Sequence, residues 1–277
     1  MPTTPQNLPA SITLVGAGKM GSAMLSGWLA MGLAGQAVTI LEPFAQADLV
    51  ATCTTHGIAL NPPASARKPA EVLILAIKPQ MLDTAAPDLA PLVGPGTLII
   101  SILAGKRIAD LAARLSGTSA IVRAMPNTPA AIGRGITGVA ASASVTPQQR
   151  AMTDALLGAV GAVEWLDSEA LIDAVTAVSG SGPAYIFYLT EALAKAGEAA
   201  GLPADLAGRL ARATVEGSGE LMRLSPDLTP AKLRENVTSP GGTTAAALSV
   251  LMADDGLSAL MAEAVAAALR RAGELSG

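Results

Sequence analysis

The segment Ser11-Ile-Thr-Leu-Val-Gly16-Ala-Gly18-Lys-Met-Gly21 is the most informative about the architecture of this 277-residue chain. Its short Ile, Leu and Val run is typical of a buried strand, and the G-x-G-x-x-G pattern is typical of the turn into a helix. The first glycine allows a tight turn, the second lets a pyrophosphate approach the backbone, and the third packs the helix against the strand. The helix start would also offer free N–H groups to phosphate. The segment therefore predicts a dinucleotide site formed by Gly16, Ala17, Gly18, Lys19, Met20 and Gly21.

An acidic residue follows the second predicted strand at the spacing that such a site requires. Glu42 lies about 20 residues after Gly21, where a carboxylate binds the adenosine ribose hydroxyls. A carboxylate accepts hydrogen bonds from a free 2′-OH but repels a 2′-phosphate, and residues 43–51 contain no Arg or Lys to offset this. We therefore expect NADH to be used at least as well as NADPH. The alternative is an ordinary glycine-rich turn with Glu42 at a solvated strand end.

The first half of the chain alternates apolar runs with helical patterns. Continuous Ile, Leu and Val runs are typical of strands that are buried on both faces of a parallel sheet. The predicted fold is an α/β, Rossmann-like doubly wound sheet. The expected strands are Ile12–Val15, Val38–Leu41, Val72–Ile77, Leu98–Ile102 and Ala120–Arg123, with Thr137–Ala143 and Val160–Leu166 as candidate edge strands. The expected helices are Gly21–Gly32, Pro43–Gly57, Gln80–Leu92 and Lys106–Ser116.

The second half, from about Leu171, shows long helical patterns rich in Ala and Leu. We expect a dinucleotide-binding Rossmann domain over residues 1–167 and an all-α domain over residues 168–277. Alanines allow close approach of helices but each buries little area, so such a domain completes its core against another subunit. We therefore expect a homo-oligomer formed through this domain. The clearest helices are Tyr185–Ala200, Pro203–Leu224 and Gly256–Ala272.

Two further turns follow predicted strands at the carboxyl edge of the sheet, where open α/β sheets bind ligands. The first is Ala76-Ile-Lys78-Pro79 and the second is Ser101-Ile-Leu-Ala104-Gly105. A solvated loop lysine is the alternative for Lys78. From these turns we add Ala76, Lys78, Pro79, Ala104 and Gly105 to the expected cofactor site.

The composition excludes several classes of protein. A net charge of −4 without a basic block argues against nucleic acid as a partner. A single cysteine, Cys53, and a single histidine, His56, exclude a disulfide framework and leave almost no material for a metal site or a Ser-His-Asp triad. Residues 1–10 carry no Lys or Arg, and the charge-free apolar runs are much shorter than the roughly 20 residues of a membrane span. We expect a cytoplasmic protein with no metal and no membrane partner.

Several motifs, in this order and spacing, resemble the Δ1-pyrroline-5-carboxylate reductase family over about Ile12 to Leu269. Besides the glycine motif and the Ile-Lys-Pro turn, they are Arg123-Ala-Met-Pro-Asn127-Thr128-Pro129, Ser179-Gly-Ser-Gly-Pro183-Ala-Tyr185 and Ser239-Pro-Gly-Gly-Thr243-Thr244. The last is the most specific. The resemblance implies reduction of the cyclic imine of pyrroline-5-carboxylate to L-proline, by direct hydride transfer from NADPH or NADH. It also implies a helical dimerisation domain, with dimers often assembled into decamers as pentamers of dimers.

The same resemblance implies roles for individual residues. Thr244 matches the threonine that orients the imine nitrogen, Glu169 matches a substrate-contacting acid, and Asn236 matches a position near the cofactor. Thr176 and Ser179–Pro183 match the segment that lines the nicotinamide side. The family more often carries Ser or a basic residue near the end of the second strand, which is consistent with NADPH use, where this chain has Glu42.

The Ser-Pro-Gly-Gly-Thr-Thr segment also supports a carboxylate site through its own chemistry. Ser239 is a good N-cap and Pro240 suits the first helical position. Gly241 and Gly242 leave the next N–H groups unshielded, beside the hydroxyls of Thr243 and Thr244. An ordinary capped helix is the alternative.

Two other functions remain open at this point. A β-hydroxyacid dehydrogenase has a similar N-terminal glycine motif, but it needs a lysine soon after a Gly-Ser-Gly. Here Pro-Ala-Tyr-Ile-Phe-Tyr follows Gly182 and the next lysine is Lys195, so alcohol oxidation would lack its base. The other alternative is a non-catalytic dinucleotide-binding regulator, because a fold alone does not fix a function.

Overall fold

The computed structural model describes residues 7–276, so the first six residues of the segment 1–10 lie outside it. The chain forms two compact units. The sheet unit comprises the described residues of Met1–Gly180 and Leu269–Gly277, and the helical unit comprises Ser181–Ala268. The predicted domain boundary between residues 167 and 168 stays a prediction.

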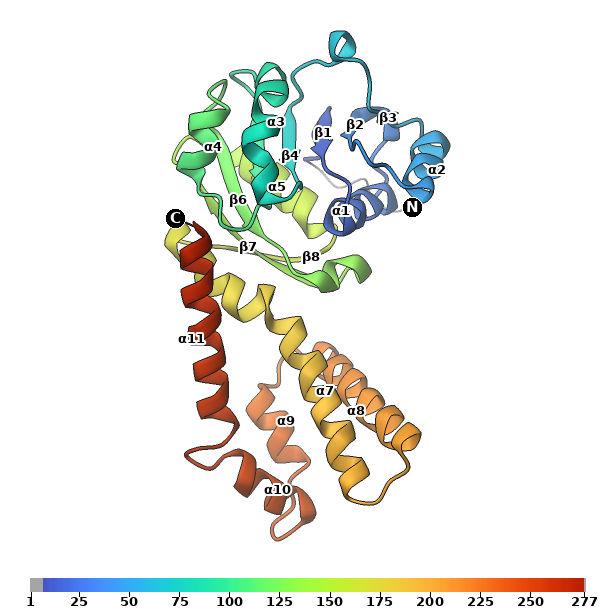
Figure 1. The fold of residues 1–277 in the computed structure, drawn as a ribbon, viewed down its shortest axis with the longest axis vertical. Coiled ribbons are helices and arrows are strands. Elements are labelled where there is room, and N and C mark those ends of the chain that lie inside the picture. Colours follow the sequence, from blue (N-terminus) through green and yellow to red (C-terminus); the bar gives the residue numbers. More distant parts are fainter. Residues whose placement is uncertain (1–6, 277) are drawn as a thin grey trace. The chain divides into compact units, whose positions relative to one another are not determined.

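The sheet unit contains an eight-stranded sheet with the strand order β3-β2-β1-β4-β5-β6-β7-β8 (Figure 1). Neighbouring strands are parallel from β3 to β6, which confirms the Rossmann-like prediction. The candidate edge strand Thr137–Ala143 corresponds to β7, which is not at the edge: it pairs antiparallel with β6 and parallel with β8, and β8 is the edge strand. The connection from β6 to β7 is too short for the crossover that parallel pairing requires. The strands are β1 Ile12–Val15, β2 Val38–Leu41, β3 Ala59–Leu60, β4 Val72–Leu75, β5 Leu98–Ser101, β6 Ile121–Met125, β7 Gly135–Ala141 and β8 Gly161–Trp165.

The central strands bury side chains on both faces, as a doubly wound sheet requires. In β4, Val72 and Ile74 belong to one hydrophobic cluster while Leu73 and Leu75 belong to a second. Helices α1 (Lys19–Ala30), α2 (Ala47–His56) and α5 (Pro147–Gly158) contribute to the first cluster. Helices α3 (Leu82–Leu89) and α4 (Ile108–Arg114) contribute to the second. Each fully buried aliphatic side chain contributes about 1.5–3 kcal/mol. The apolar runs from which the strands were predicted therefore form the hydrophobic core of the sheet unit.

The helices of the sheet unit follow the predicted segments with shifted ends. The predicted helix Gln80–Leu92 is divided into two 3-10 turns flanking α3, and α5 and the 3-10 and π turns were not predicted. The lone cysteine, Cys53, faces the core from α2, and burial raises the pKa of its thiol. The helices are α1 Lys19–Ala30, α2 Ala47–His56, α3 Leu82–Leu89, α4 Ile108–Arg114, α5 Pro147–Gly158 and α6 Ile172–Val175, with a π-helical turn Thr176–Gly180.

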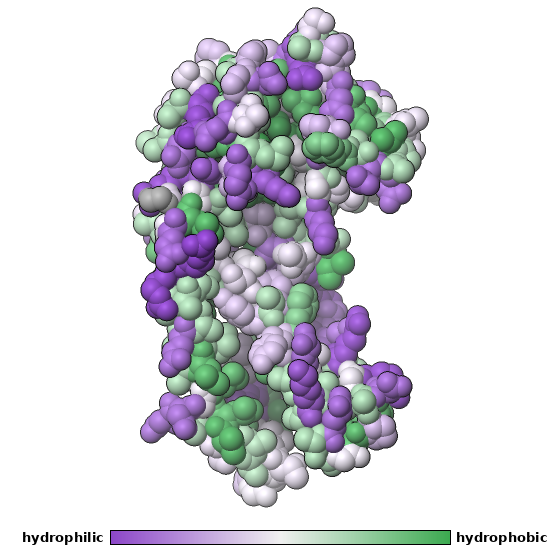
Figure 2. All heavy atoms as spheres, in the orientation of Figure 1, coloured by the Kyte–Doolittle hydropathy of each residue, from purple (hydrophilic) through white to green (hydrophobic). Residues whose placement is uncertain are grey.

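The helical unit has almost no core of its own in a single chain. Its buried hydrophobic residues are Ala207 and Ala211, both small and both on α8. Large apolar side chains stay exposed, among them Phe187 at 64% and Tyr188 at 68%. Figure 2 shows hydrophobic side chains gathered over α10 and the adjoining part of α11. The helices are α7 Gly182–Ala199, α8 Ala204–Leu224, α9 Pro230–Asn236, α10 Thr243–Leu251 and α11 Leu257–Ser276, whose last turns belong to the sheet unit.

One helical stretch, Glu169–Ala199, has the length and composition that could cross a membrane, with a mean hydropathy of 1.2. Only 11% of its apolar window is buried within the chain. A single stretch of this kind is also what a helix covered by another subunit looks like, so it gives no argument for a membrane on its own.

Candidate active site

The glycine loop lies between β1 and α1, and two of its glycines are required by packing. Gly16 adopts a φ of +88°, and a Cβ there would lie 2.7 Å from the carbonyl oxygen of Ala76. A Cβ on Gly21 would lie 2.3 Å from the carbonyl oxygen of Gly16. A side chain at either position would push α1 away from the sheet.

Gly18 is different, because the fold itself does not require it to be glycine. Its φ of −66° suits any residue, and a Cβ there would meet nothing within 4 Å. Gly18 is the N-cap of α1, and no side chain caps this helix. The N–H groups of the first turn therefore point toward open space, which is the arrangement that a pyrophosphate needs.

A cavity of about 520 Å³ opens beside this loop. It extends from the glycine loop to the end of β2, so the groups that the sequence assigns to phosphate and to ribose line the same space. The sequence assigned Ala17, Gly18, Lys19 and Glu42 to the cofactor, and the structure brings all four together here. The lining residues are Ala17, Gly18, Lys19, Ser22, Leu25, Ser26, Glu42, Phe44, Gln46, Asp48, Leu49 and Thr52.

The Glu42 carboxylate is held in place by backbone groups. Its Oε2 accepts a hydrogen bond from the Ala17 N–H at 2.8 Å, and its Oε1 accepts one from the Phe44 N–H at 3.0 Å. The Asn61 side chain fixes the Glu42 backbone by two 2.8 Å bonds, one to its N–H and one to its carbonyl. Each carboxylate oxygen has further lone pairs for ribose hydroxyls. These carboxylate acceptors, together with the uncapped N–H groups and the open space at Gly18, fit a dinucleotide.

The other predicted cofactor turns follow β4 and β5, which are the next strands along the sheet after β1. Ala76 follows β4 and donates its N–H to the Val15 carbonyl at 2.7 Å, while Lys78 lies beyond it, just before Pro79. Ala104 and Gly105 follow β5. Because parallel strands end at one edge, these turns share an edge with the glycine loop.

Gly105 also has a packing role that the sequence did not reveal. Its φ is +71°, and a Cβ there would lie 2.5 Å from the carbonyl oxygen of Leu275, in the last turn of α11. Packing against Leu275 is therefore enough to explain why this position is glycine, with no ligand needed. A cofactor contact at Gly105 stays a prediction.

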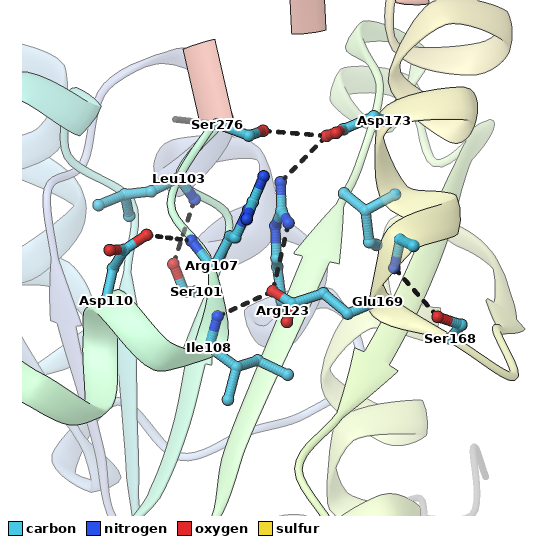
Figure 3. Close-up of polar contacts among 12 residues, drawn as sticks. Ser101, Leu103, Arg107, Ile108, Asp110, Arg123, Ser168, Glu169, Asp173 and Ser276 are labelled. Atoms are coloured by element: carbon cyan, nitrogen blue, oxygen red, sulfur yellow. Dashed lines mark hydrogen bonds and ion pairs between the residues drawn. The ribbon is translucent and has the colours of Figure 1, made fainter. Parts of the chain in front are cut away.

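A buried arginine in the middle of β6 pairs with two carboxylates (Figure 3). The Arg123 side chain is 4% exposed, and its guanidinium pairs with Glu169 at 3.2 Å and with Asp173 at 3.5 Å. Glu169 also accepts the Ile108 N–H at 2.8 Å, and Ser276 donates to Asp173 at 3.1 Å. The Glu169 carboxylate is therefore already paired within the sheet unit, and a contact between Glu169 and the substrate stays a prediction. We call these four residues, Arg123, Glu169, Asp173 and Ser276, the arginine cluster.

Asn127 is a second buried polar residue that the motif contained without an assigned role. Its Oδ1 accepts the Ile136 N–H at 2.9 Å, and its Nδ2 donates to the Ser179 carbonyl at 3.2 Å. It thereby fixes the π-helical turn to the end of β6. The hydroxyls of Thr176 and Ser179 donate to carbonyls one turn earlier. π-helical turns occur frequently at functional sites. The only sign of this turn in the sequence was the Ser-Gly-Ser-Gly run, because glycine disfavours a regular helix.

In the helical unit, the predicted N-cap at Ser239 is wrong. Ser239 to Gly242 form a turn, closed by a 3.0 Å bond from the Gly242 N–H to the Ser239 carbonyl. Gly241 has a φ of +68°, which no helix accommodates, so α10 begins only at Thr243 with Gly242 as its N-cap. Pro followed by glycine with positive φ is typical of a type II turn. A Cβ on Gly242 would lie 2.6 Å from the Ser239 hydroxyl.

The shifted helix start still leaves a candidate anion site. No side chain caps α10, so its first N–H groups have no capping partner, and Thr243 and Thr244 occupy its first turn. Asn236 is the exposed last residue of α9. These residues and the glycine loop belong to different compact units, so their convergence on one site stays a prediction.

A group of metal ligands is not found among residues 7–276: no three His, Cys, Asp or Glu side chains come close enough together to hold an ion.

Comparisons with known proteins identify the family. The model for pyrroline-5-carboxylate reductase dimerisation matches residues 169–275, and that for NADP oxidoreductase, coenzyme F420-dependent, matches residues 11–105. A pyrroline-5-carboxylate reductase of Pseudomonas aeruginosa is 42% identical over 267 residues, which are 96% of each chain. The chain belongs to the pyrroline-5-carboxylate reductase family. Another member, from Synechocystis, is 43% identical over 95% of this chain and 97% of its own.

Solved structures of the family share the fold over nearly the whole chain. The pyrroline-5-carboxylate reductase of Coxiella burnetii superposes with a TM-score of 0.89 at 34% identity, covering 97% of this chain and 99% of its own. The Plasmodium falciparum enzyme, solved with NADP bound, gives 0.80 at 25% identity over 97% of this chain and 98% of its own. The family, fold class and oxidoreductase class predicted from the sequence are confirmed, and the β-hydroxyacid dehydrogenase family is not the one found.

Proposed function

We propose that the chain reduces the cyclic imine of 1-pyrroline-5-carboxylate to L-proline with NAD(P)H. The observation that carries the proposal is the cavity shared by the uncapped start of α1, Gly18 and Glu42, in a chain of this family. NAD(P)H would supply the hydride that bonds to the imine carbon. The nitrogen carries the proton before transfer, so the C=N bond becomes the C–N bond of proline.

The chain's own residues are expected to position the reactants. The N–H groups at the start of α1 would bind pyrophosphate, and Glu42 would bind the adenosine ribose. The uncapped start of α10 would bind the substrate carboxylate, and the Thr244 hydroxyl would orient the imine nitrogen. A protonated imine accepts hydride readily, so correct positioning supplies much of the rate and no strong acid is needed.

The proposal is tested by following nicotinamide absorbance with 1-pyrroline-5-carboxylate, and in reverse with a hydroxyacid. Loss of NADH absorbance with the imine alone supports the reductase. Turnover of the hydroxyacid instead would support a dehydrogenase, and dinucleotide binding without turnover of either would support the non-catalytic regulator.

Replacing Thr244 by Ala is expected to lower the turnover number about tenfold while leaving dinucleotide affinity unchanged, since one positioning hydrogen bond is lost. Steady-state rates and calorimetric NADH titrations measure the two quantities. Thr55→Ala, at an exposed threonine on α2 that does not line the cavity, is the matched control. A Thr244→Ala enzyme with wild-type turnover would refute the assigned role.

We further propose that NADH is used at least as well as NADPH. Glu42 lines the cavity beside the glycine loop, and its carboxylate would face the 2′ position of a ribose bound there. Like charges about 4 Å apart repel by about 1–4 kcal/mol, depending on solvent exposure. We expect Glu42→Ser and Glu42→Gln to shift the NADPH-to-NADH ratio of kcat/KM by at least about tenfold toward NADPH. Because Gln has nearly the shape of Glu but no charge, Glu42→Gln measures the effect of the charge alone. A wild-type enzyme that strongly prefers NADPH would contradict the proposal.

We propose a cytoplasmic homodimer formed through the helical unit, with five dimers forming a decamer and with no membrane or nucleic-acid partner. The support is the exposed apolar surface of α7 and α8 together with the dimerisation model that matches residues 169–275. Light scattering of the purified chain is expected to give ten times the 27.5 kDa of one chain, and a mass of twice 27.5 kDa would support the dimer but contradict the decamer. A monomer would contradict the proposal.

A further inference from the structure

Phe44 exposes an unusual amount of apolar surface for the sheet unit. It is 77% exposed, more than any other large hydrophobic residue in the described part of the chain. The chain contains only two Phe, two Tyr and two Trp. A lone exposed apolar side chain is common on protein surfaces, and the groups that surround this ring are what point to a ligand.

The backbone that carries this ring is fixed at both of its polar groups. The Phe44 N–H donates to Glu42 Oε1 at 3.0 Å, and the Phe44 carbonyl accepts from Gln46 Nε2 at 3.1 Å. The same Glu42 carboxylate accepts the Ala17 N–H at 2.8 Å. One side chain thus ties the turn after β2 to the glycine loop, and the ring is held next to the ribose-binding carboxylate.

Phe44 also lines the cavity that contains Gly18 and Glu42. A dinucleotide with its pyrophosphate at Gly18 and its ribose at Glu42 has one further group beyond that ribose, the adenine ring. Adenine is flat and aromatic, and such bases stack on aromatic side chains. We propose that Phe44 is the stacking platform for the adenine of the dinucleotide, an inference that rests on the dinucleotide site of the proposed function.

If Phe44 stacks on adenine, its replacement should weaken only the binding of ligands that contain adenine. Phe44→Ala is expected to weaken ADP-ribose binding, measured by calorimetry, about 5- to 30-fold. The KM for NADH rises by a similar factor, while the KM for reduced nicotinamide mononucleotide, which has no adenine, stays unchanged. Phe44→Trp is expected to retain the wild-type affinity for ADP-ribose. Phe44→Leu is expected to bind ADP-ribose more tightly than Phe44→Ala but more weakly than wild type, because leucine keeps apolar area without a π-face.

Val50→Ala is the matched control, since Val50 is an exposed apolar residue on α2 that does not line the cavity. ADP-ribose affinity equal to wild type in Phe44→Ala would overturn the proposal, as would equal losses for NADH and reduced nicotinamide mononucleotide. A change in oligomer mass without a change in ADP-ribose affinity would place the ring at a subunit contact and also overturn it. If the wild-type chain binds ADP-ribose through Phe44 but does not reduce the imine, the proposed function fails while this inference stands.

Discussion

An alanine at position 18 is expected to leave the folding stability nearly unchanged and to weaken NADH binding about 100-fold. The added methyl group meets nothing within 4 Å in the folded chain, and the local φ of −66° accepts it. Gly is a somewhat better N-cap than Ala, but Ala also lowers the entropy of the unfolded chain, so the net change in stability stays within about 1 kcal/mol. In the proposed site, the methyl group would occupy the path by which pyrophosphate reaches the N–H groups of α1. Losing two hydrogen bonds to a charged group costs about 3 kcal/mol, or about 100-fold in affinity.

Thermal unfolding and calorimetric titration with NADH measure the two effects on the same protein. Gly21→Ala is the contrasting variant, because its Cβ would lie 2.3 Å from a backbone oxygen of the fold itself. That variant should lose stability even without ligand. Wild-type NADH affinity in Gly18→Ala would place the pyrophosphate elsewhere and remove the basis of the proposed site.

The second large effect concerns the arginine cluster. Arg123→Met is expected to lower the free energy of unfolding by about 3 kcal/mol, the lower end for breaking a buried ion pair, because Glu169 and Asp173 keep some access to water. Denaturant unfolding should show a lower midpoint with an unchanged slope. The triple variant Arg123→Met, Glu169→Gln, Asp173→Asn should recover part of the loss, since no unpaired charge remains.

Arg271→Met removes a solvent-exposed ion pair with Glu274 on α11 and is the control, expected to change stability little. If Arg123→Met were no more destabilising than Arg271→Met, the arginine cluster would not contribute to the stability of the sheet unit.

Local patterns in the sequence predicted most of the sheet unit. The Ile, Leu and Val runs became β1, β2, β4 and β5 almost residue for residue, because strands buried on both faces need such runs. β3 was missed because its two residues are too few to form a pattern. α5 was missed although it carried a clear signal: Thr146, Pro147 and Gln149 form a capping box with proline at the first helical position.

The residues of the site also divide into those that a local sequence pattern predicts and those that it does not. The glycine loop and Glu42 were predictable because their spacing within one β-α-β unit encodes their contact. The arginine cluster was not, because Arg123 meets partners 46 and 50 residues further along, and Ser276 meets Asp173 across 103 residues. The N-cap at Ser239 was mispredicted because Pro240 suits the first residue of a helix and the second residue of a turn equally well, and only the positive φ of Gly241 distinguishes them.

The last turn of α11 packs its Leu275 against Gly105 and bonds its Ser276 to Asp173, within the unit that begins the chain. A ribosome delivers residues in order, and an N-terminal domain normally folds while the remainder is still being translated. Here the sheet unit gains the contacts of Leu275 and Ser276 only after the whole helical unit, Ser181–Ala268, has been synthesised. The sheet unit therefore cannot complete its packing before the helical unit has been translated, and loss of residues 269–276 would destabilise the half of the chain that was made first.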